Sequence, residues 1–123
     1  MSATQGVELL EAVRQFLRQE VLPAMDDFKA YNTRVAANAL GIVAREMQMG
    51  AGLAELDAQI AAALGLDAKA GSITQQIALA LRDGTLAADG LVLSYLKQRT
   101  LLAIAIDNPK YSGLQQAREQ WGE

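Results

Sequence analysis

The chain has 123 residues, of which 51% are hydrophobic and only 5% aromatic, and its formal net charge is −3. It contains no cysteine and no histidine. This excludes disulfides, metal sites that use thiolate or imidazole ligands, cysteine nucleophiles and every mechanism that needs a histidine base.

Length and composition predict the fold class. A chain of this size is one domain by length and buries enough surface to fold without staples. We expect a single domain over residues 1–123, with residues 1–5 as a flexible polar tail. Because aromatic residues are few, the core must consist mainly of Leu, Ile, Val and Ala, which suits packed helices. The predicted fold is all-α, an antiparallel bundle of about five helices with a short C-terminal helix.

Charge and hydropathy argue against two classes of partner. The lysines and arginines are scattered along the chain, so no basic stripe is expected to bind a nucleic acid. The apolar run over residues 101–106 is far shorter than the roughly 20 residues that cross a bilayer. The N-terminus lacks the basic and apolar regions of a signal peptide. We therefore expect a cytoplasmic protein that binds neither nucleic acid nor membrane.

Helical periodicity defines the predicted elements. The first helix runs from residue 6 or 7 to Leu22 and stops at Pro23. After a short link, in which Asp26 or Asp27 can act as a cap, the second helix covers residues 29–49. So short a link makes these two helices antiparallel neighbours.

The same signals predict further helices over residues 53–64, 73–84, 90–106 and 114–121. Gly65 and Gly84 are their expected C-terminal stops. Ser72, followed by Gln75 in a capping-box pattern, and Asp89 are the expected N-caps. Trp121 is the expected anchor of the last helix.

The second predicted helix is the expected centre of the bundle. Val35, Ala39 and Ile42 fall on one apolar stripe. Small residues at positions 36, 37, 39 and 41 let another helix approach closely. Glu46 projects into the apolar stripe, where a carboxylate needs a partner.

Two further charges intrude on apolar helix faces, Glu20 on the first helix and Arg99 on the fifth. We predict structural ion pairs that set the register of the bundle, with Glu46 as the partner of Arg99 and Glu20 as the open alternative. A carboxylate-lined metal site, as in di-iron bundles, is the competing interpretation. The chain has no histidine, and an antiparallel hairpin places Glu20 and Glu46 near opposite ends of the bundle. We therefore expect no metal and no cofactor.

A second stripe on the helix over residues 29–49 is the candidate binding site. Arg34, Asn38 and Arg45 flank the apolar stripe, with Gly41 as a gap between them. Guanidinium forks match the oxygens of a carboxylate or phosphate. The structural alternative is that these groups bond to loop carbonyls and to acids such as Asp107.

The turn after the fifth predicted helix completes this candidate surface. It gathers Asp107, Asn108, Lys110 and Tyr111 around Pro109. Asp and Asn before Pro are also ordinary turn residues, so a structural role is the alternative here too. A ligand or partner surface, if present, is expected on this turn together with the arginine stripe.

Three segments together carry a family resemblance: LLEAVRQFLRQEVLP, RVAANALGIVARE and AIDNPKY. They resemble a bacterial family of domains of unknown function, DUF6285, encoded beside or fused to aminoglycoside-type phosphotransferases and acyl-CoA dehydrogenases. The resemblance implies association with such a partner and no activity for the domain itself. The sequence has neither the Gly-rich phosphate loop nor the histidine of a kinase catalytic loop.

The resulting prediction is a non-enzymatic accessory or protein-interaction domain whose partner is a co-encoded phosphotransferase or acyl-CoA dehydrogenase. Ala-rich helix faces and Trp121 also allow a homodimer. The alternative is a small-molecule module that holds an acyl or acyl-CoA ligand between helices, with its anionic end near Arg34 and Arg45. An apolar pocket beside these arginines would distinguish the two. An enzyme would have only Asp, Glu, Lys, Arg and Tyr as catalytic groups.

Overall fold

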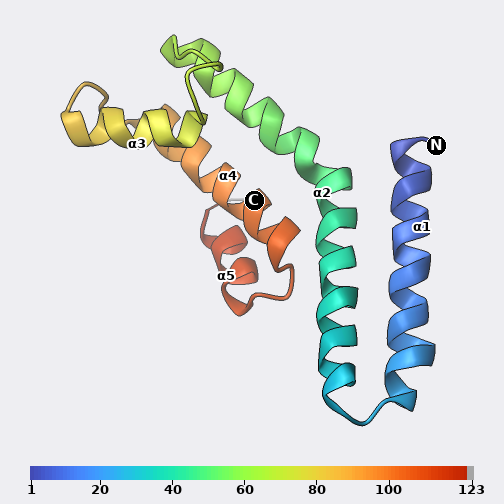
Figure 1. The fold of residues 1–123 in the computed structure, drawn as a ribbon. Coiled ribbons are helices and arrows are strands. Elements are labelled where there is room, and N and C mark those ends of the chain that lie inside the picture. Colours follow the sequence, from blue (N-terminus) through green and yellow to red (C-terminus); the bar gives the residue numbers. More distant parts are fainter. Residues whose placement is uncertain (122–123) are drawn as a thin grey trace. The chain divides into compact units, whose positions relative to one another are not determined.

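The computed structural model describes residues 1–121, and helices form most of this part of the chain (Figure 1). Its five α-helices are α1 (Ala3–Phe16), α2 (Phe28–Leu64), α3 (Ile73–Asp83), α4 (Gly90–Asp107) and α5 (Ser112–Gln120). A π-helical turn (Leu17–Val21) and a 3-10 turn (Leu22–Ala24) follow α1. Residues 1–121 contain no strand. The predicted all-α class and the short C-terminal helix are confirmed.

The chain divides into two compact units. The first unit comprises Met1–Gly50 with Ile106–Asn108, and the second comprises Ala51–Ala105 with the described residues from Pro109 onward. Helices α2 and α4 each contribute residues to both units.

Helix α1 begins at Ala3, inside the segment that the sequence analysis expected to be a loose tail. The Ser2 hydroxyl accepts a hydrogen bond from the Gln5 N–H at 3.2 Å, and the Gln5 side chain accepts one from the Ser2 N–H at 2.8 Å. This capping box satisfies two backbone donors that the start of a helix would leave free. The helix therefore starts three residues before the expected Gly6.

The end of α1 widens into the π turn directly before Pro23. Pro23 has no N–H, and its ring crowds the carbonyl of Gln19, four residues earlier. The Leu22 N–H accordingly donates to the Leu17 carbonyl, five residues back. The chain then leaves the helix through the 3-10 turn, so the stop predicted at Pro23 is confirmed.

Helix α2 is continuous from Phe28 to Leu64, so the predicted break at Gly50 and Gly52 is wrong. Neither glycine adopts a positive φ. A helical glycine costs about 1 kcal/mol relative to alanine, but Gly52 also provides space, because a Cβ there would lie 3.0 Å from Cδ2 of Leu102. Gly52 thus permits close packing and does not end the helix.

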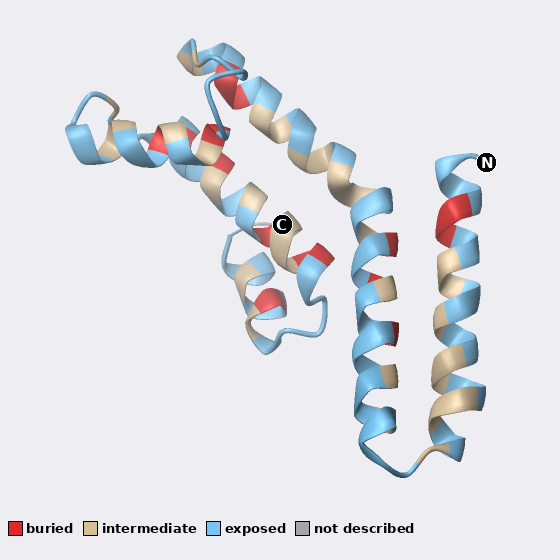
Figure 2. Ribbon diagram, in the orientation of Figure 1, coloured by how far each residue is buried: buried red, intermediate tan, exposed pale blue. Residues whose placement is uncertain are grey.

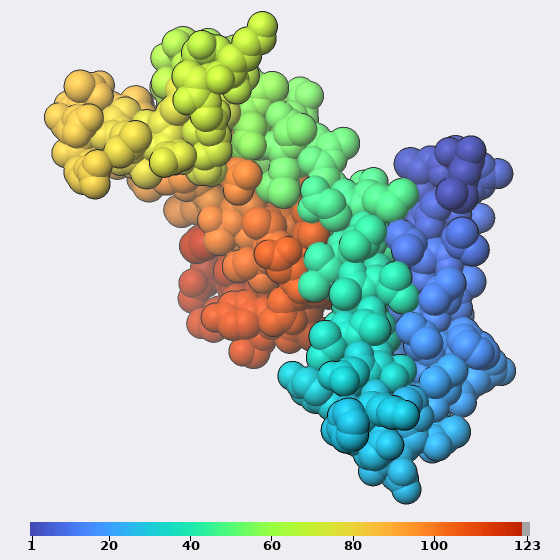
Figure 3. Space-filling model, in the orientation of Figure 1, coloured from blue at the N-terminus to red at the C-terminus, as the bar shows by residue number. Residues whose placement is uncertain are grey.

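In the first unit, α1 and α2 form the predicted antiparallel hairpin (Figure 1). The residues of α2 that face α1 are small, and Ala37 and Ala44 are each only 1% exposed. Near the open end of the hairpin, Met47 Cε lies 2.8 Å from where a Gly6 Cβ would be. The buried positions of α2 in this unit lie on the side toward α1 (Figure 2), and the two helices meet along this seam (Figure 3).

This packing corrects the predicted apolar stripe of α2. Val35 and Ile42 are 48% and 38% exposed, and Ala39 is exposed as well. Glu46, which shares their stripe, is therefore exposed and not inward as predicted. Alanine and glycine let two backbones approach more closely than β-branched side chains do, so α1 packs on the small-residue side of α2.

The second unit contains a conventional apolar core between the second half of α2, α3 and α4. Its buried members are Ile60, Ala61, Ile73, Ile77, Val92 and Tyr95. The predicted caps are confirmed, because Ser72 accepts from the Gln75 N–H at 3.1 Å and Asp89 from the Val92 N–H at 3.0 Å. Gly65 and Gly84 follow α2 and α3 with positive φ, as predicted for C-terminal stops.

Helix α5 is anchored by Leu114 and not by Trp121. Leu114 is buried and packs with Leu101 and Ala105 of α4. Trp121 is exposed at the end of α5. Leu114 lies in the first turn of α5 and points into this cluster, so the prediction of Trp121 as the anchor is wrong.

The α1–α2 seam leads to a first prediction. Replacing Ala44 by leucine inserts three carbons between the two backbones, and we expect a loss of about 1–3 kcal/mol in the free energy of unfolding. Ala39→Leu adds the same volume on an exposed face and should change it by less than about 0.5 kcal/mol. Urea denaturation followed by circular dichroism measures the free energy of unfolding of both variants. Equal losses would contradict close packing of α1 against Ala44.

Candidate functional site

The predicted binding stripe lies on one side of the α1–α2 seam. Arg34 and Asn38 are exposed and Arg45 is half-buried. Their spacing along α2 places them on one face of the helix. Gly41 lies between Asn38 and Arg45 on the same side.

Helix α1 adds charged residues to this side that the sequence analysis did not select. The Arg14 guanidinium donates to the Glu11 carboxylate, with Nη2 and Oε2 2.7 Å apart. This hydrogen bond lowers the pKa of Glu11, and the nearby charge of Arg45 adds to the effect. A Cβ on Gly41 would lie 3.0 Å from Nη1 of Arg45 and 3.3 Å from Cδ of Arg14. Because Gly41 has no side chain, the side chains of both arginines can lie across α2 at this position.

Arg18 lies one turn beyond Arg14, within the π turn. Its Nη2 donates to the Asn38 side-chain oxygen. Its Nε is buried and has no hydrogen-bond partner within residues 1–121. These charged residues of α1 and the predicted stripe of α2 lie on one side of the hairpin, which we call the arginine face. Its members are Glu11, Arg14, Arg18, Arg34, Asn38 and Arg45. The four- and three-residue spacing of its α1 members could have revealed it in the sequence.

Arg45 has a structural contact in the first unit. Its Nε donates to the Ile106 carbonyl at 2.7 Å. Ile106 lies in the last turn of α4, where carbonyls have no partner within the helix. Arg45 therefore caps this helix end, and its Nη groups remain available for other bonds.

The predicted turn is divided between the two units. Asp107 and Asn108 belong to the first unit, whereas Lys110 and Tyr111 belong to the second. All four residues are exposed. The structure therefore groups Asp107 and Asn108 with Arg34, Asn38 and Arg45, and it does not group Lys110 and Tyr111 with them.

Arg99 pairs with Asp57, so the predicted pairing with Glu46 is wrong. Arg99 Nε lies 2.9 Å from Asp57 Oδ1, and its Nη2 lies 3.4 Å from Oδ2. Glu20, the open alternative, is exposed like Glu46, and both belong to the first unit.

Tyr95 completes this cluster in the second unit by donating its hydroxyl to Asp57 Oδ1 at 2.7 Å. Burial raises the pKa of Tyr95, and the bond to Asp57 raises it further. The bond to Asp57 also raises the pKa of Arg99. One carboxylate thus links α2 to two residues of α4, which fixes the register of these helices.

The sequence contains a signal for the inward position of Asp57. Leu53, Asp57, Ile60 and Leu64 follow one another at helical spacing. Asp57 therefore interrupts an apolar stripe, just as Glu46 interrupts the stripe of Val35 and Ile42 earlier in α2. Asp57 lies within the helix expected over residues 53–64, so this signal did not depend on the wrong break at Gly50.

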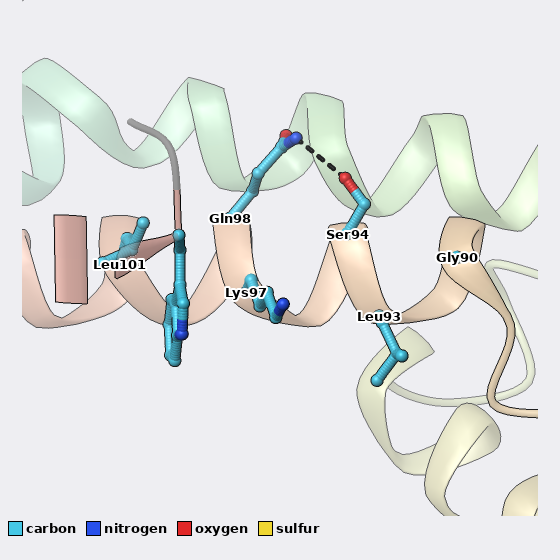
Figure 4. A pocket seen from close by; sticks show the side chains of 7 residues that line it. Gly90, Leu93, Ser94, Lys97, Gln98 and Leu101 are labelled. Carbon is cyan, nitrogen blue, oxygen red and sulfur yellow. Dashed lines mark hydrogen bonds between the residues drawn. The ribbon is translucent and has the colours of Figure 1, made fainter. Parts of the chain in front are cut away.

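Two open hollows lie on α4 in the second unit. One has a volume of about 290 Å³ and is bordered by Ser94, Lys97 and Gln98 (Figure 4). There the Lys97 ammonium lies 6.0 Å from the centre of the Trp121 ring, and Gln98 donates to Ser94 at 3.1 Å. The other, of about 160 Å³, lies beside Tyr95. Neither hollow is lined by a residue of the arginine face.

Two negative findings apply to residues 1–121. No group of three or more acidic side chains there is arranged to hold a metal ion. None of the helices in that range is both long and apolar enough to span a bilayer.

The described residues are helical throughout both units, and the hairpin of the first unit has a cationic side. The family model of DUF6285, a domain of unknown function, matches residues 23–111. Because the match covers more than half of the chain, the protein belongs to this family, and the resemblance seen in the sequence is confirmed at that level. The match begins after α1. No curated protein and no solved structure matches the chain.

The Asp57 cluster leads to a second prediction. Asp57→Ala leaves the Arg99 charge without its partner and the Tyr95 hydroxyl without its acceptor, so we expect a loss of about 2 kcal/mol in the free energy of unfolding. Asp83→Ala, at the exposed end of α3, should change it by less than about 0.5 kcal/mol. Urea titrations of both variants test this, and an Asp57→Ala protein of unchanged stability would contradict it.

The raised pKa of Tyr95 leads to a third prediction. Its stabilising contribution is complete below the unfolded pKa of about 10 and decreases as pH rises further, because only the unfolded chain then releases the proton. Between about pH 10 and 11.5, the free energy of unfolding should therefore decrease less steeply for Tyr95→Phe than for the wild type. Tyr111→Phe, an exposed control, should retain the wild-type slope. Identical slopes for all three proteins would refute the effect.

Proposed function

We propose that this protein is an accessory interaction domain that binds another protein through one side of its α1–α2 hairpin. The observation that carries the proposal is a set of large apolar side chains that remain exposed in the first unit. We call this set the apolar face, and its members are Leu9, Val13, Phe16, Val43 and Met47. Leu9, Phe16 and Val43 are 56%, 53% and 48% exposed.

Helix geometry places these residues on one side of the seam. Leu9, Val13 and Phe16 follow one another at spacings of four and three on α1, and Val43 and Met47 are four apart on α2. Met47 reaches toward Gly6 from this side, whereas Arg14 and Arg45 meet over Gly41 on the other. A contiguous exposed apolar patch with a polar opposite side is typical of a protein-interaction surface.

The partner that we propose is a co-encoded phosphotransferase or acyl-CoA dehydrogenase, as the family resemblance suggests. We place this complex in the cytoplasm, as expected from the sequence. Two copies of this chain could also pair through the apolar face, which would bury the same side chains. Measuring the mass of the protein in solution distinguishes this pairing from binding to another protein.

The acyl-binding alternative receives no support from the site. It requires an apolar pocket beside Arg34 and Arg45. The two hollows on α4 include neither arginine. No observation therefore favours this second function.

The fourth prediction concerns a matched pair of valines on α2. Val43→Lys places a charge in the apolar face, whereas Val35→Lys places one on the back of α2 at the same exposed fraction, 48%. We expect Val43→Lys to weaken capture of the co-encoded phosphotransferase or dehydrogenase about tenfold or more. The reason is that burying the lysine ammonium in the interface costs desolvation free energy. Val35→Lys should retain binding.

The assay is a pull-down of the purified co-encoded enzymes by the tagged protein, with light scattering to measure its mass. Far-UV circular dichroism verifies that both variants are folded. A dimer that Val43→Lys dissociates would identify a second copy as the occupant. A monomer that captures neither enzyme, or equal effects of the two variants, would overturn the proposal.

A further inference from the structure

We propose that the arginine face is an oxyanion-binding site that takes a phosphate group, with Arg14, Arg18 and Arg45 as its principal residues. This site lies across the seam from the apolar face and is independent of the interaction proposed above. Nothing in the family description assigns a ligand to this domain.

The first argument is that three arginine side chains lie on the same side of the hairpin. Arg14 and Arg45 meet over Gly41, where a Cβ would be only 3.3 Å and 3.0 Å from their side chains. Arg18 reaches the same side of α2 through its bond to Asn38, three residues before Gly41. Arg14 and Arg45 therefore fill the space above Gly41, and Arg18 lies beside them over Asn38 on the same side of α2.

The second argument is the local charge. Arg34 lies one turn before Asn38 on the same stripe, so the first unit carries four of the chain's seven arginines. Glu11 is the carboxylate that forms an ion pair with them. The arginine face, with its four arginines and Glu11, therefore has a formal charge of +3, although the first unit as a whole has seven acidic residues against five basic ones. A phosphate group carries between about 1.5 and 2 negative charges at neutral pH and balances this positive charge better than a single carboxylate.

The third argument is the set of donors that remain. Arg14 uses its Nε and Nη2 on Glu11, and Arg45 uses its Nε on Ile106. Both Nη groups of Arg45 remain, and Arg18 Nε is buried without an acceptor within residues 1–121. A buried donor without a partner carries a desolvation cost. Guanidinium groups donate in forks that match phosphate oxygens, so a bound phosphate supplies acceptors to the Nη groups of Arg45 and to Nη1 of Arg18, which make no hydrogen bond within residues 1–121.

The π turn contributes to the placement of Arg18. Such turns are rare and recur at functional sites. Here the turn widens the chain at Leu17–Val21 immediately before Pro23. Arg18 therefore leaves α1 from a wider turn than Arg14 does, and it contacts Asn38 on α2.

The test is calorimetric titration of the full chain with sodium phosphate and, separately, with glycerol phosphate as a phosphate monoester. Sodium chloride at the same ionic strength is the control for screening. We expect saturable binding of one phosphate group per chain, absent with chloride. Tighter binding of inorganic phosphate would indicate a free-ion site, and tighter binding of the monoester would indicate the phosphate of a larger molecule.

The variants separate the site from general charge. Arg18→Ala should raise the Kd for phosphate about tenfold, because charged hydrogen bonds are lost. Arg118→Ala removes an exposed arginine of α5 in the second unit and should leave the Kd unchanged. Arg18→Lys, which retains the charge without the fork, should give an intermediate Kd. If Arg18→Ala does not fold, the exposed Arg34→Ala should still raise the Kd by about threefold, the effect of removing a peripheral charge.

Two results would overturn this site. One is a phosphate titration that does not differ from the chloride titration, and the other is an equal Kd for Arg18→Ala and Arg118→Ala. Val43→Lys should bind phosphate like the wild type, because it changes the other side of the hairpin. A failure of the oxyanion site is thereby distinguishable from a failure of the proposed protein interaction.

Discussion

The close packing of α1 against the small residues of α2 is the constraint on which the hairpin depends. Ala37 and Ala44 are almost completely buried at this seam, and Gly41 lies at its edge. Because the seam uses the small residues, the larger Val35 and Ile42 point away from α1. The same rotation turns Glu46 outward, so this acid needs no buried partner. Which α2 side chains are accessible to a ligand or partner follows from this one contact.

The seam also separates two surfaces of different chemistry. Helix α1 presents Leu9, Val13 and Phe16 to one side and Glu11, Arg14 and Arg18 to the other. Helix α2 continues each set with residues of the same character. An apolar surface is favoured by removal from water, whereas arginines favour an anion that retains specific hydrogen bonds. A two-helix hairpin can therefore carry two binding functions, since its faces do not compete for the same residues.

Part of this arrangement was predictable. Arg34, Asn38 and Arg45 were found as a stripe because helical spacing alone places them together. The spacing of Glu11, Arg14 and Arg18 on α1 was available too, but which α2 residues they join depends on the register of the antiparallel hairpin. Asp57 was predictable in principle from its place among Leu53, Ile60 and Leu64. It lies within the helix expected over residues 53–64, so the wrong break at Gly50 did not hide it. The break itself was wrong because glycine in a helix can mark either a stop or a close contact.

The all-α class and the family could be read from the composition and from segments spread along the chain. The N-caps at Ser72 and Asp89 and the stops at Pro23, Gly65 and Gly84 depend on residues within a turn or two of one another, so local hydrogen bonding and backbone geometry decide them. The continuity of α2, the pairing of Arg99 with Asp57, and the stripe of α2 that packs against α1 could be seen only in the folded chain. These depend on side-chain volume and on partners far away in the chain, where an apolar stripe and a small-residue stripe compete for the same neighbour.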